Sequence, residues 1–338
     1  MPSTINDVAK LSNVSITTVS RVINNNYPVN KETKARVLKA IKELNYKPNM
    51  IARSLITKKT SVIGIIIPGL TNLFFPTIVE AIEKSSKEAC YTIFLGNCYG
   101  NSREEIKIIE DMAQRSVDGI IIIDPQFDNV KKGVYKRFQK SLPMITVGGF
   151  PSDSASSSVT YDEQIGTKEA FSYLLSLGHK KIAFIRGGKS YSYDVKEKIY
   201  NEILKENNFT FSNIVKIESG NSIEAVNSSE NKIKKILSER EKPTAIFACN
   251  DLMAVGSLNA CRSLNIKVPD EISIIGCDDT LLSEISNPKL TSINLHMKEV
   301  GERAASRLIS LINGDGKESK PIKILTNLVI RDSCRKVK

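Results

Sequence analysis

The first sixty residues carry apolar side chains at helical spacing. Apolar residues recur every three or four positions, at Val8, Leu11, Val14, Val19, Val22 and Ile23. The polar pair Ser12-Asn13 interrupts this series, which predicts two short helices joined by a tight turn, a helix-turn-helix. A third helix is expected from Lys31 to Leu44. Its apolar side chains are expected to face the first two helices, and they are Val37, Leu38, Ile41 and Leu44.

Three polar residues in this segment are suited to begin helices. Thr4 precedes the first helix and has Asp7 three residues later, a variant of the capping box with Asp in place of Glu. Ser15 precedes the second helix, and Asn30 precedes the third. Their side-chain oxygens can accept hydrogen bonds from free amides of the first helical turn, so each is predicted to be an N-cap.

A different pattern begins at Ser61 and continues through the rest of the chain. Short, almost entirely apolar segments span residues 62–67, 91–96, 119–123, 144–147, 181–185, 244–249 and 272–276. Amphipathic segments such as 76–89 and 231–240 lie between them. Strands without polar alternation are typical of parallel sheets that helices cover on both faces. The predicted fold class is therefore an all-α helix-turn-helix head plus an α/β core of two doubly wound parallel-sheet lobes.

The positive charge of the chain is concentrated in the head. Residues 1–60 contain 11 Lys and Arg against 3 Asp and Glu, whereas residues 61–338 contain 37 against 34. A small, basic helical unit has the electrostatic character expected of a protein that contacts nucleic-acid phosphates. The alternative, an ordinary helical subdomain, does not explain this asymmetry.

Other features limit the compartment and the chemistry. No apolar run approaches the roughly 20 residues needed to span a bilayer, and MPSTINDVAK lacks the apolar core of a signal peptide, so a cytoplasmic protein without membrane contact is expected. The six cysteines and two histidines lack metal-ligand spacing, so reduced thiols and no metal site are expected. Since no P-loop, GxGxxG or nucleophile-elbow pattern occurs, we expect no catalytic residues, no cofactor and no enzymatic activity.

Two stretches of the head, TINDVAKLSNVSITTVSRVINN and NYKPNMIARSL, are similar to the LacI/GalR family of bacterial transcription regulators. The similarity continues in ACNDLMAVGSLNACRSLNIKVPDEISIIGCDD, in LTSINLHMKEVGERAASRLI and in the terminal IRDSC. The resemblance implies lobes of the periplasmic-binding-protein-like type. It also implies a homodimeric repressor that binds a near-palindromic operator in double-stranded DNA. A small-molecule effector in the cleft between the lobes, expected to be a sugar or sugar derivative, would control it.

The family pattern predicts the domain limits as well. The domains are the helix-turn-helix head (1–46), the hinge helix with its linker (47–60), the first lobe (61–160 and 291–322) and the second lobe (161–290 and 323–338). Three strands that cross between the lobes would act as a hinge.

The second helix of the head is predicted to enter the major groove, where each base pair shows a distinct pattern of donors and acceptors. Arg21 can bond bidentately to a guanine edge, and Ile16 can contact a thymine methyl group. By the resemblance, the segment after Pro48 is a hinge helix that folds on DNA and wedges Leu55 into the minor groove. The residues expected to contact DNA are Thr4, Ser15, Ile16, Thr17, Thr18, Ser20, Arg21, Asn24, Tyr27, Ala52, Arg53 and Leu55.

Polar and aromatic residues follow the predicted strands, at the end of the sheet where parallel folds bind ligands. Amides and carboxylates there can bond to hydroxyl groups, and aromatic rings can stack on the apolar face of a polyol. The resemblance adds positions that match effector contacts in the family, whereas Asp251 is expected to cap the helix that follows it. The effector-binding candidates are Asn72, Phe74, Phe75, Asp124, Tyr161, Lys196, Asn250 and Asp278.

The chain departs from sugar-binding family members at three points. Lys196 stands where many members have arginine, Gly148-Gly149 stand where an aspartate or arginine often occurs, and the chain has no tryptophan. Lysine is a point donor and lacks the planar, bidentate geometry of arginine. Two alternatives therefore stay open. One is a catabolite-control-type regulator activated by a phosphorylated phosphocarrier protein, and the other is a sugar-binding protein without a transcriptional role.

Overall fold

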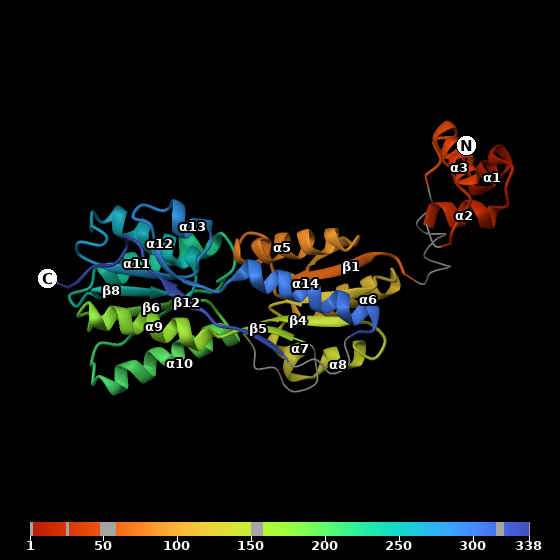
Figure 1. The fold of residues 1–338 in the computed structure, drawn as a ribbon. Coiled ribbons are helices and arrows are strands. Elements are labelled where there is room, and N and C mark those ends of the chain that lie inside the picture. Colours follow the sequence, from red (N-terminus) through yellow and green to blue (C-terminus); the bar gives the residue numbers. More distant parts are fainter. Residues whose placement is uncertain (1–2, 25–26, 48–58, 150–157, 316–320, 338) are drawn as a thin grey trace. The chain divides into compact units, whose positions relative to one another are not determined.

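The computed structural model describes residues 3–24, 27–47, 59–149, 158–315 and 321–337. The chain divides into two compact units, Met1–Thr60 and Ser61–Lys338. The first unit is helical, and the second contains two β-sheets with helices packed against them (Figure 1). The predicted combination of an all-α head with an α/β core is therefore confirmed.

The head consists of α1 (Ile5–Ser12), α2 (Ile16–Asn24) and α3 (Lys31–Glu43). Its buried apolar core is formed by Val8, Ala9, Val19, Val22, Val37 and Ala40. The expectation that Leu38 faces the other two helices is wrong, because half of its surface is exposed. Ala40 takes that role instead, since Val37, Ala40 and Ile41 follow the three-and-four spacing of one helical face and Leu38 lies on its flank.

The predicted N-caps of the head are present. The Thr4 hydroxyl accepts from the Asp7 amide at 3.4 Å while the Asp7 carboxylate accepts from the Thr4 amide at 2.8 Å, which completes the capping box. The Asn30 side chain accepts from the Glu32 amide at 3.0 Å. At the start of α2, the Ser15 hydroxyl accepts from the Thr18 amide at 3.2 Å.

Each sheet of the second unit has six strands. The first sheet is ordered β11-β5-β4-β3-β1-β2 and the second β12-β10-β9-β8-β6-β7. The strands of the first are β1 (Val62–Ile67), β2 (Thr92–Asn97), β3 (Gly119–Ile123), β4 (Met144–Gly148), β5 (Ser158–Tyr161) and β11 (Ile322–Ile324). Those of the second are β6 (Ile182–Arg186), β7 (Asn213–Lys216), β8 (Ala245–Ala248), β9 (Ser273–Asp278), β10 (Thr291–Asn294) and β12 (Asn327–Val329).

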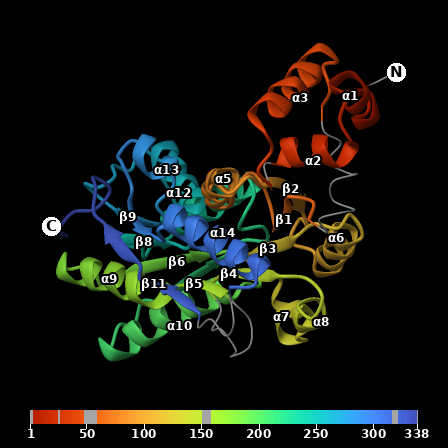
Figure 2. The same cartoon turned by 45° about the vertical axis from the view of Figure 1, so that its right-hand side comes forward.

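Helices cover both sheets and define two lobes. The first lobe contains α5 (Phe74–Glu88), α6 (Ser102–Gln114), α7 (Phe127–Lys131), α8 (Val134–Phe138) and α14 (Met297–Asn313). The second contains α9 (Glu163–Ser176), α10 (Tyr191–Glu206), α11 (Glu224–Leu237), α12 (Asp251–Ser263) and α13 (Leu281–Ile285). Although far apart in sequence, α5 and α14 lie side by side (Figure 2).

Among the described residues, no helix has the length and apolar character needed to cross a membrane.

The strand pairing is parallel throughout both sheets except between β10 and β12. This arrangement matches the doubly wound architecture expected from the apolar segments, and all seven of those segments contain a strand. Five other strands, β5, β7, β10, β11 and β12, were not predicted. They have only three or four residues and mix polar with apolar side chains, so they lack the hydrophobic run by which the others are recognised.

The chain crosses three times between the lobes, after β5, after β10 and between β11 and β12. The strand β10 was expected to begin the return to the first lobe, but it pairs with β9 in the second sheet. The other lobe limits stay predictions. At one crossing, the Thr326 hydroxyl accepts from the Gly166 amide at 2.9 Å and donates to the Asp162 carbonyl at 2.7 Å. A Cβ at Gly166 would lie 2.4 Å from Ile293 Cγ2, so only glycine permits this approach.

Gly166→Ala should therefore destabilise the crossing. Overpacking of this kind costs about 1–3 kcal/mol of unfolding free energy. The matched control is Gly69→Ala, since a Cβ at Gly69 would meet nothing nearer than the Asn221 carbonyl at 3.6 Å. Urea denaturation of both variants measures the difference, and equal stability of the two would contradict the close packing at Gly166.

Candidate functional site

The second helix of the head presents a polar face with one exposed apolar residue. Ile16, Thr17 and Arg21 are exposed, while Thr18 and Ser20 are half-buried. Thr17 and Arg21 are four residues apart, so their side chains share one face of α2, and Ile16 is exposed at the start of the same helix. This face is the one that a helix-turn-helix presents to a groove of the duplex.

Several of the other candidate DNA contacts hold one another in place. The hydroxyls of Ser15 and Thr18 are hydrogen bonded at 2.9 Å, and Asn24 Nδ2 donates to the Ser20 carbonyl and hydroxyl at 2.9 and 3.2 Å. The Arg21 guanidinium lies over the Tyr27 ring, 5.0 Å from its centroid. Such contacts reduce the conformational entropy that the side chains would lose on binding. Thr4 serves as a helix cap, as described above.

The three hinge candidates Ala52, Arg53 and Leu55 lie outside the described residues. Their contact with DNA stays a prediction.

In the α/β unit, the ends of strands from both lobes surround a small cavity. Its volume is about 30 Å³, and seven of the eight effector-binding candidates line it. The lining includes Asn72, Phe74, Phe75, Asp124, Tyr161, Glu163, Ser190, Ser192, Tyr193, Asn221, Asn250 and Asp278. Asp124, Ser190, Tyr193 and Asn221 also line a wider space of about 590 Å³, so the cavity and this space, which we call the mouth, are adjacent. The strand-end residues of both lobes are thus brought together.

The aromatic candidates form one wall of the cavity. The Phe74 ring packs edge-to-face on Phe75 at 5.1 Å and on Tyr161 at 5.8 Å between centroids. All three side chains are buried. The rings therefore pack edge-to-face on one another and form an apolar wall.

A hydrogen bond joins the two lobes across the cleft, and further bonds hold its partners in the second lobe. Asn72 Nδ2 of the first lobe donates to Asn221 Oδ1 of the second at 3.1 Å, and the Tyr193 hydroxyl donates to the same oxygen at 3.2 Å. Asn250 Nδ2 donates to the Gly220 carbonyl at 2.7 Å, while Asn250 Oδ1 accepts from the Met253 amide at 3.0 Å as the N-cap of α12. The polar atoms of Asn250 are therefore already occupied by the protein.

Lys196 is the one effector-binding candidate outside the cavity lining. Its side chain is 1% exposed, its ammonium forms an ion pair with Glu163, and it donates to the Ser192 hydroxyl at 2.6 Å. Glu163 thus stands between Lys196 and the cavity.

Three residues that line the cavity, Glu163, Tyr193 and Asn221, were not predicted. They follow β5, β6 and β7, and two of these strands were not recognised in the sequence. The rule that ligands bind at strand ends identifies such residues only when the strands are known.

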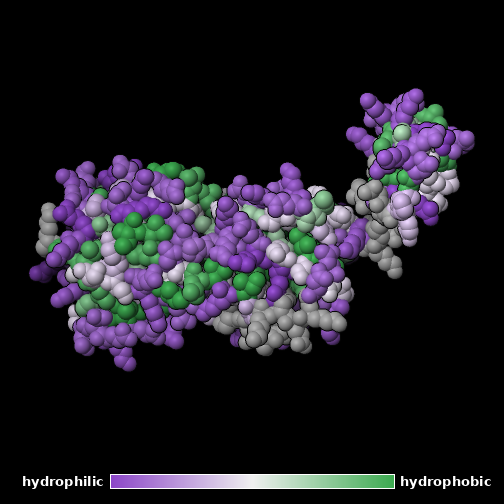
Figure 3. All heavy atoms as spheres, viewed as in Figure 1, coloured by the Kyte–Doolittle hydropathy of each residue, from purple (hydrophilic) through white to green (hydrophobic). Residues whose placement is uncertain are grey.

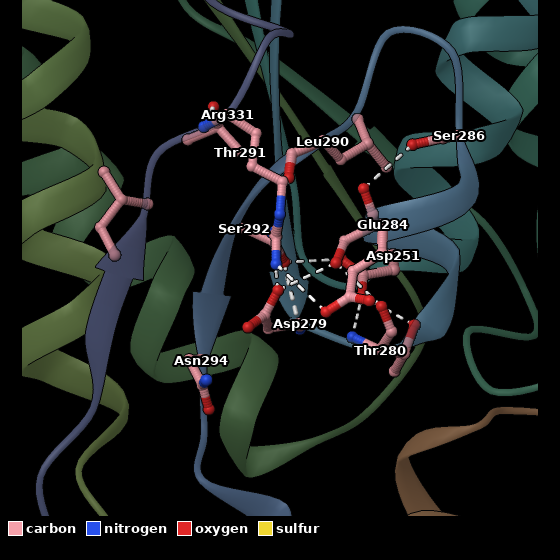
Figure 4. A network of polar contacts seen from close by, with 12 residues as sticks. Asp251, Asp279, Thr280, Glu284, Ser286, Leu290, Thr291, Ser292, Asn294 and Arg331 are labelled. Atoms are coloured by element: carbon pink, nitrogen blue, oxygen red, sulfur yellow. Dashed lines mark hydrogen bonds and ion pairs between the residues drawn. The ribbon is translucent and has the colours of Figure 1, made fainter.

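A buried network supports the loop that carries Asp278 (Figure 4). The expectation that Asp251 caps the helix after it is wrong, because Asn250 occupies the N-cap position and Asp251 is the first helical residue. The Asp251 carboxylate instead accepts from the Thr280 amide at 2.7 Å and from the Ser292 hydroxyl at 2.6 Å. Asp279 is paired with Arg331 at 2.7 Å. These bonds hold the loop after β9 against β10.

The environment of the carboxyl groups that line the cavity disfavours their ionised forms. Burial raises the pKa of the Asp124 carboxyl to about 7, with further upward contributions from Glu163 and Glu105 that Lys196 partly offsets. Burial, followed by the charge of Asp251, raises the pKa of Asp278 well above its usual range. Both residues also have positive backbone φ angles, 49° and 103° respectively. Strain of about 1–3 kcal/mol per residue in such conformations is typical of functional sites.

The raised pKa of Asp124 makes the stability of the protein depend on pH. A carboxyl whose folded pKa exceeds its unfolded pKa stabilises the folded state at pH values below about 4, and this stabilisation is lost as the pH rises through about 7. Asn cannot ionise, so Asp124→Asn should be more stable than wild type at pH 8. The difference in unfolding free energy between variant and wild type should be about 2–4 kcal/mol larger at pH 8 than at pH 4. Denaturant titrations at both pH values measure this, with the exposed Asp128→Asn as the matched control. A pH-independent difference would contradict the burial of the Asp124 charge.

Comparisons with known proteins identify the family of this chain. The model of bacterial regulatory proteins of the lacI family matches residues 4–49, and that of the periplasmic binding protein-like domain matches residues 171–334. The chain is 33% identical to catabolite control protein A of Priestia megaterium, with 99% of this chain and 100% of the relative covered. It is 33% identical to the HTH-type transcriptional repressor PurR of Histophilus somni (strain 2336), over 98% of this chain and 99% of the relative.

Solved structures agree with these relatives. The crystal structure of the lac repressor dimer bound to operator and the anti-inducer ONPF superposes with a TM-score of 0.89 at 26% identity, covering 99% of this chain and 100% of that one. The similarity therefore extends over the head and both lobes. The chain belongs to the LacI family of bacterial regulatory proteins.

Proposed function

We propose that this transcriptional regulator represses its targets as a homodimer on a near-palindromic operator, and that a small molecule in the cleft controls its DNA affinity. It would act in the cytoplasm, where the DNA is. The observation that carries the proposal is the presence in one chain of an exposed helix-turn-helix face and a cleft lined by both lobes. The homologous repressors support it.

The DNA contact is assigned to the exposed face of α2. Arg21 would read a guanine edge, Ile16 would contact a thymine methyl group, and the Lys and Arg excess of residues 1–60 would contact phosphates. The hinge residues Ala52, Arg53 and Leu55 would add minor-groove contacts.

Dimer formation is supported by apolar side chains on the surface of the α/β unit. Hydrophobic residues interrupt the hydrophilic surface on the face shown in Figure 3. Phe94 and Leu95 are exposed on β2, which is an edge strand, and Leu281 and Ile285 are exposed on α13. These exposed apolar side chains are available for contact with a second copy of the chain.

Control would work through the angle between the lobes. An effector that bonds to groups of both lobes favours one lobe arrangement by its difference in affinity for the two. The bond between Asn72 and Asn221 is one contact that such a change would break or form. Two heads on one dimer would then fit, or fail to fit, the spacing of the half-sites.

Arg21→Ala should relax base selectivity. Loss of a bidentate base contact costs about 1–3 kcal/mol of discrimination, so the preference for duplexes selected from a random pool over mismatched duplexes should fall about five-fold or more. Lys39→Ala is the matched control, since it removes an exposed charge from α3. Fluorescence anisotropy measures both. Unchanged selectivity in Arg21→Ala would move the base contacts away from α2.

Asp278→Asn should weaken effector binding in the cleft. A compound that raises the melting temperature of the wild type, found in a screen of sugars, phosphosugars and nucleobases, should bind this variant about ten-fold more weakly, the effect of losing roughly 1.4 kcal/mol. DNA binding without the compound should be retained. Asp315→Asn, at an exposed position, is the control. A normal response of Asp278→Asn would place effector control elsewhere, as the phosphocarrier alternative does.

A further inference from the structure

A buried glutamate in the cavity lining has one carboxylate oxygen without a hydrogen-bond partner among the described residues. Glu163 is 4% exposed, and its Oε2 is paired with the Lys196 ammonium. Its Oε1 has no hydrogen-bond partner within the part of the chain that the structure describes. Because an unsatisfied buried polar group costs free energy, and a charged one costs more, this oxygen is placed for a donor that the protein itself does not supply.

Gly149 leaves the space that this carboxylate occupies. A Cβ at Gly149 would lie 2.8 Å from Glu163 Cγ and 3.1 Å from Oε1. Any larger residue would push Glu163 away from its position. The glycine after β4 and the glutamate that begins α9 therefore act together to put a carboxylate into the cavity.

The titratable groups that line the cavity are all acidic except for tyrosine and cysteine side chains. Asp124, Glu163 and Asp278 line it, and the Lys196 ammonium beside them is already bonded to Glu163 and Ser192. The nearby Arg186 does not compensate them, since it is paired with Asp194 and Glu197. The charged side chains that line the mouth besides Asp124 are Lys189, Glu218 and Glu224. A positive charge placed among these acidic groups would favour the ionised forms of Asp124 and Asp278, whereas an anion would disfavour them.

The sizes of the two spaces limit what can enter. The cavity of about 30 Å³ is close to the space one water takes up in the liquid, which also suits an ammonium group. The mouth of about 590 Å³ has room for the body of a small molecule. Among the described residues, no three His, Cys, Asp or Glu side chains are grouped as metal ligands, so the cavity does not resemble a metal site.

We infer that the cleft binds a small polar molecule with a primary ammonium group, whose nitrogen enters the cavity beside Glu163 Oε1 and the carboxylates of Asp124 and Asp278. The remainder of the molecule lies in the mouth, among Tyr191, Asn221 and Glu218. The inference rests on the proposed function, in which this cleft is the effector site. The raised pKa of Asp124 agrees with it, because a bound cation would lower that pKa and stabilise the ionised carboxylate.

The test compares compounds that share a skeleton and differ in charge. Isothermal titration of the full chain uses D-glucose, D-glucosamine and D-glucose 6-phosphate, followed by D-galactose and D-galactosamine, with ethanolamine as the minimal amine. In at least one pair the amine should bind ten-fold or more tightly than its neutral parent, and the phosphate should bind most weakly. Glu163→Gln should remove the preference for the amine, whereas Glu202→Gln, at an exposed position of α10, should retain it.

Each result of the titrations either supports or overturns an ammonium group as the ligand of the cavity. Equal or weaker binding of the amines, tightest binding of the phosphate, or no binding by any amine would overturn it. If Glu163→Gln fails to fold because Lys196 loses its partner, Asp124→Asn provides the variant arm. Anisotropy with selected duplexes is measured on the same samples. Intact DNA binding without an amine preference would reject only the ligand class, whereas amine binding without sequence-specific DNA binding would reject the proposed function.

Discussion

The three crossings of the chain between the sheets are the constraint on which the cleft depends. Each crossing leads from a strand end in one lobe into the other lobe, and the Gly166–Thr326 contact holds two crossing segments together. Parallel strands place their carboxyl ends at one edge of a sheet, so the crossings bring these edges into opposition. Asn72 and Asp124 of the first lobe therefore share a cavity with Asn250 and Asp278 of the second.

The same arrangement forces unfavourable electrostatics on the residues that line the cavity. Carboxyl groups of both lobes line one small space, and two of them have raised pKa values because desolvation and neighbouring carboxylates oppose ionisation. The protein offsets part of this cost with the Lys196 ion pair and with the hydrogen bonds that hold Asp251. Carboxyl groups with raised pKa values lower the stability of the folded protein. Their concentration in one cavity is typical of a binding site.

Local signals predicted the parts of the structure that depend on neighbours in sequence. The caps Thr4, Ser15 and Asn30 were identified because a capping side chain bonds to an amide two or three residues away. Leu38 was misplaced since helical spacing alone does not say which flank of α3 faces α1 and α2. Asp251 was misassigned because its partners, Thr280 and Ser292, are 29 and 41 residues away.

The sequence by itself determined the helical head, the parallel α/β class and most of the strand-end residues, since these follow from hydrophobic period, charge and short-range hydrogen bonding. Only the tertiary structure decided that Lys196 lies outside the cavity, that Glu163 takes its place there, and that Asn221 joins the lobes. These outcomes depend on contacts between residues 33 to 149 positions apart in the chain. Such contacts exist only after both sheets are assembled, because no local pattern encodes which strand ends will meet.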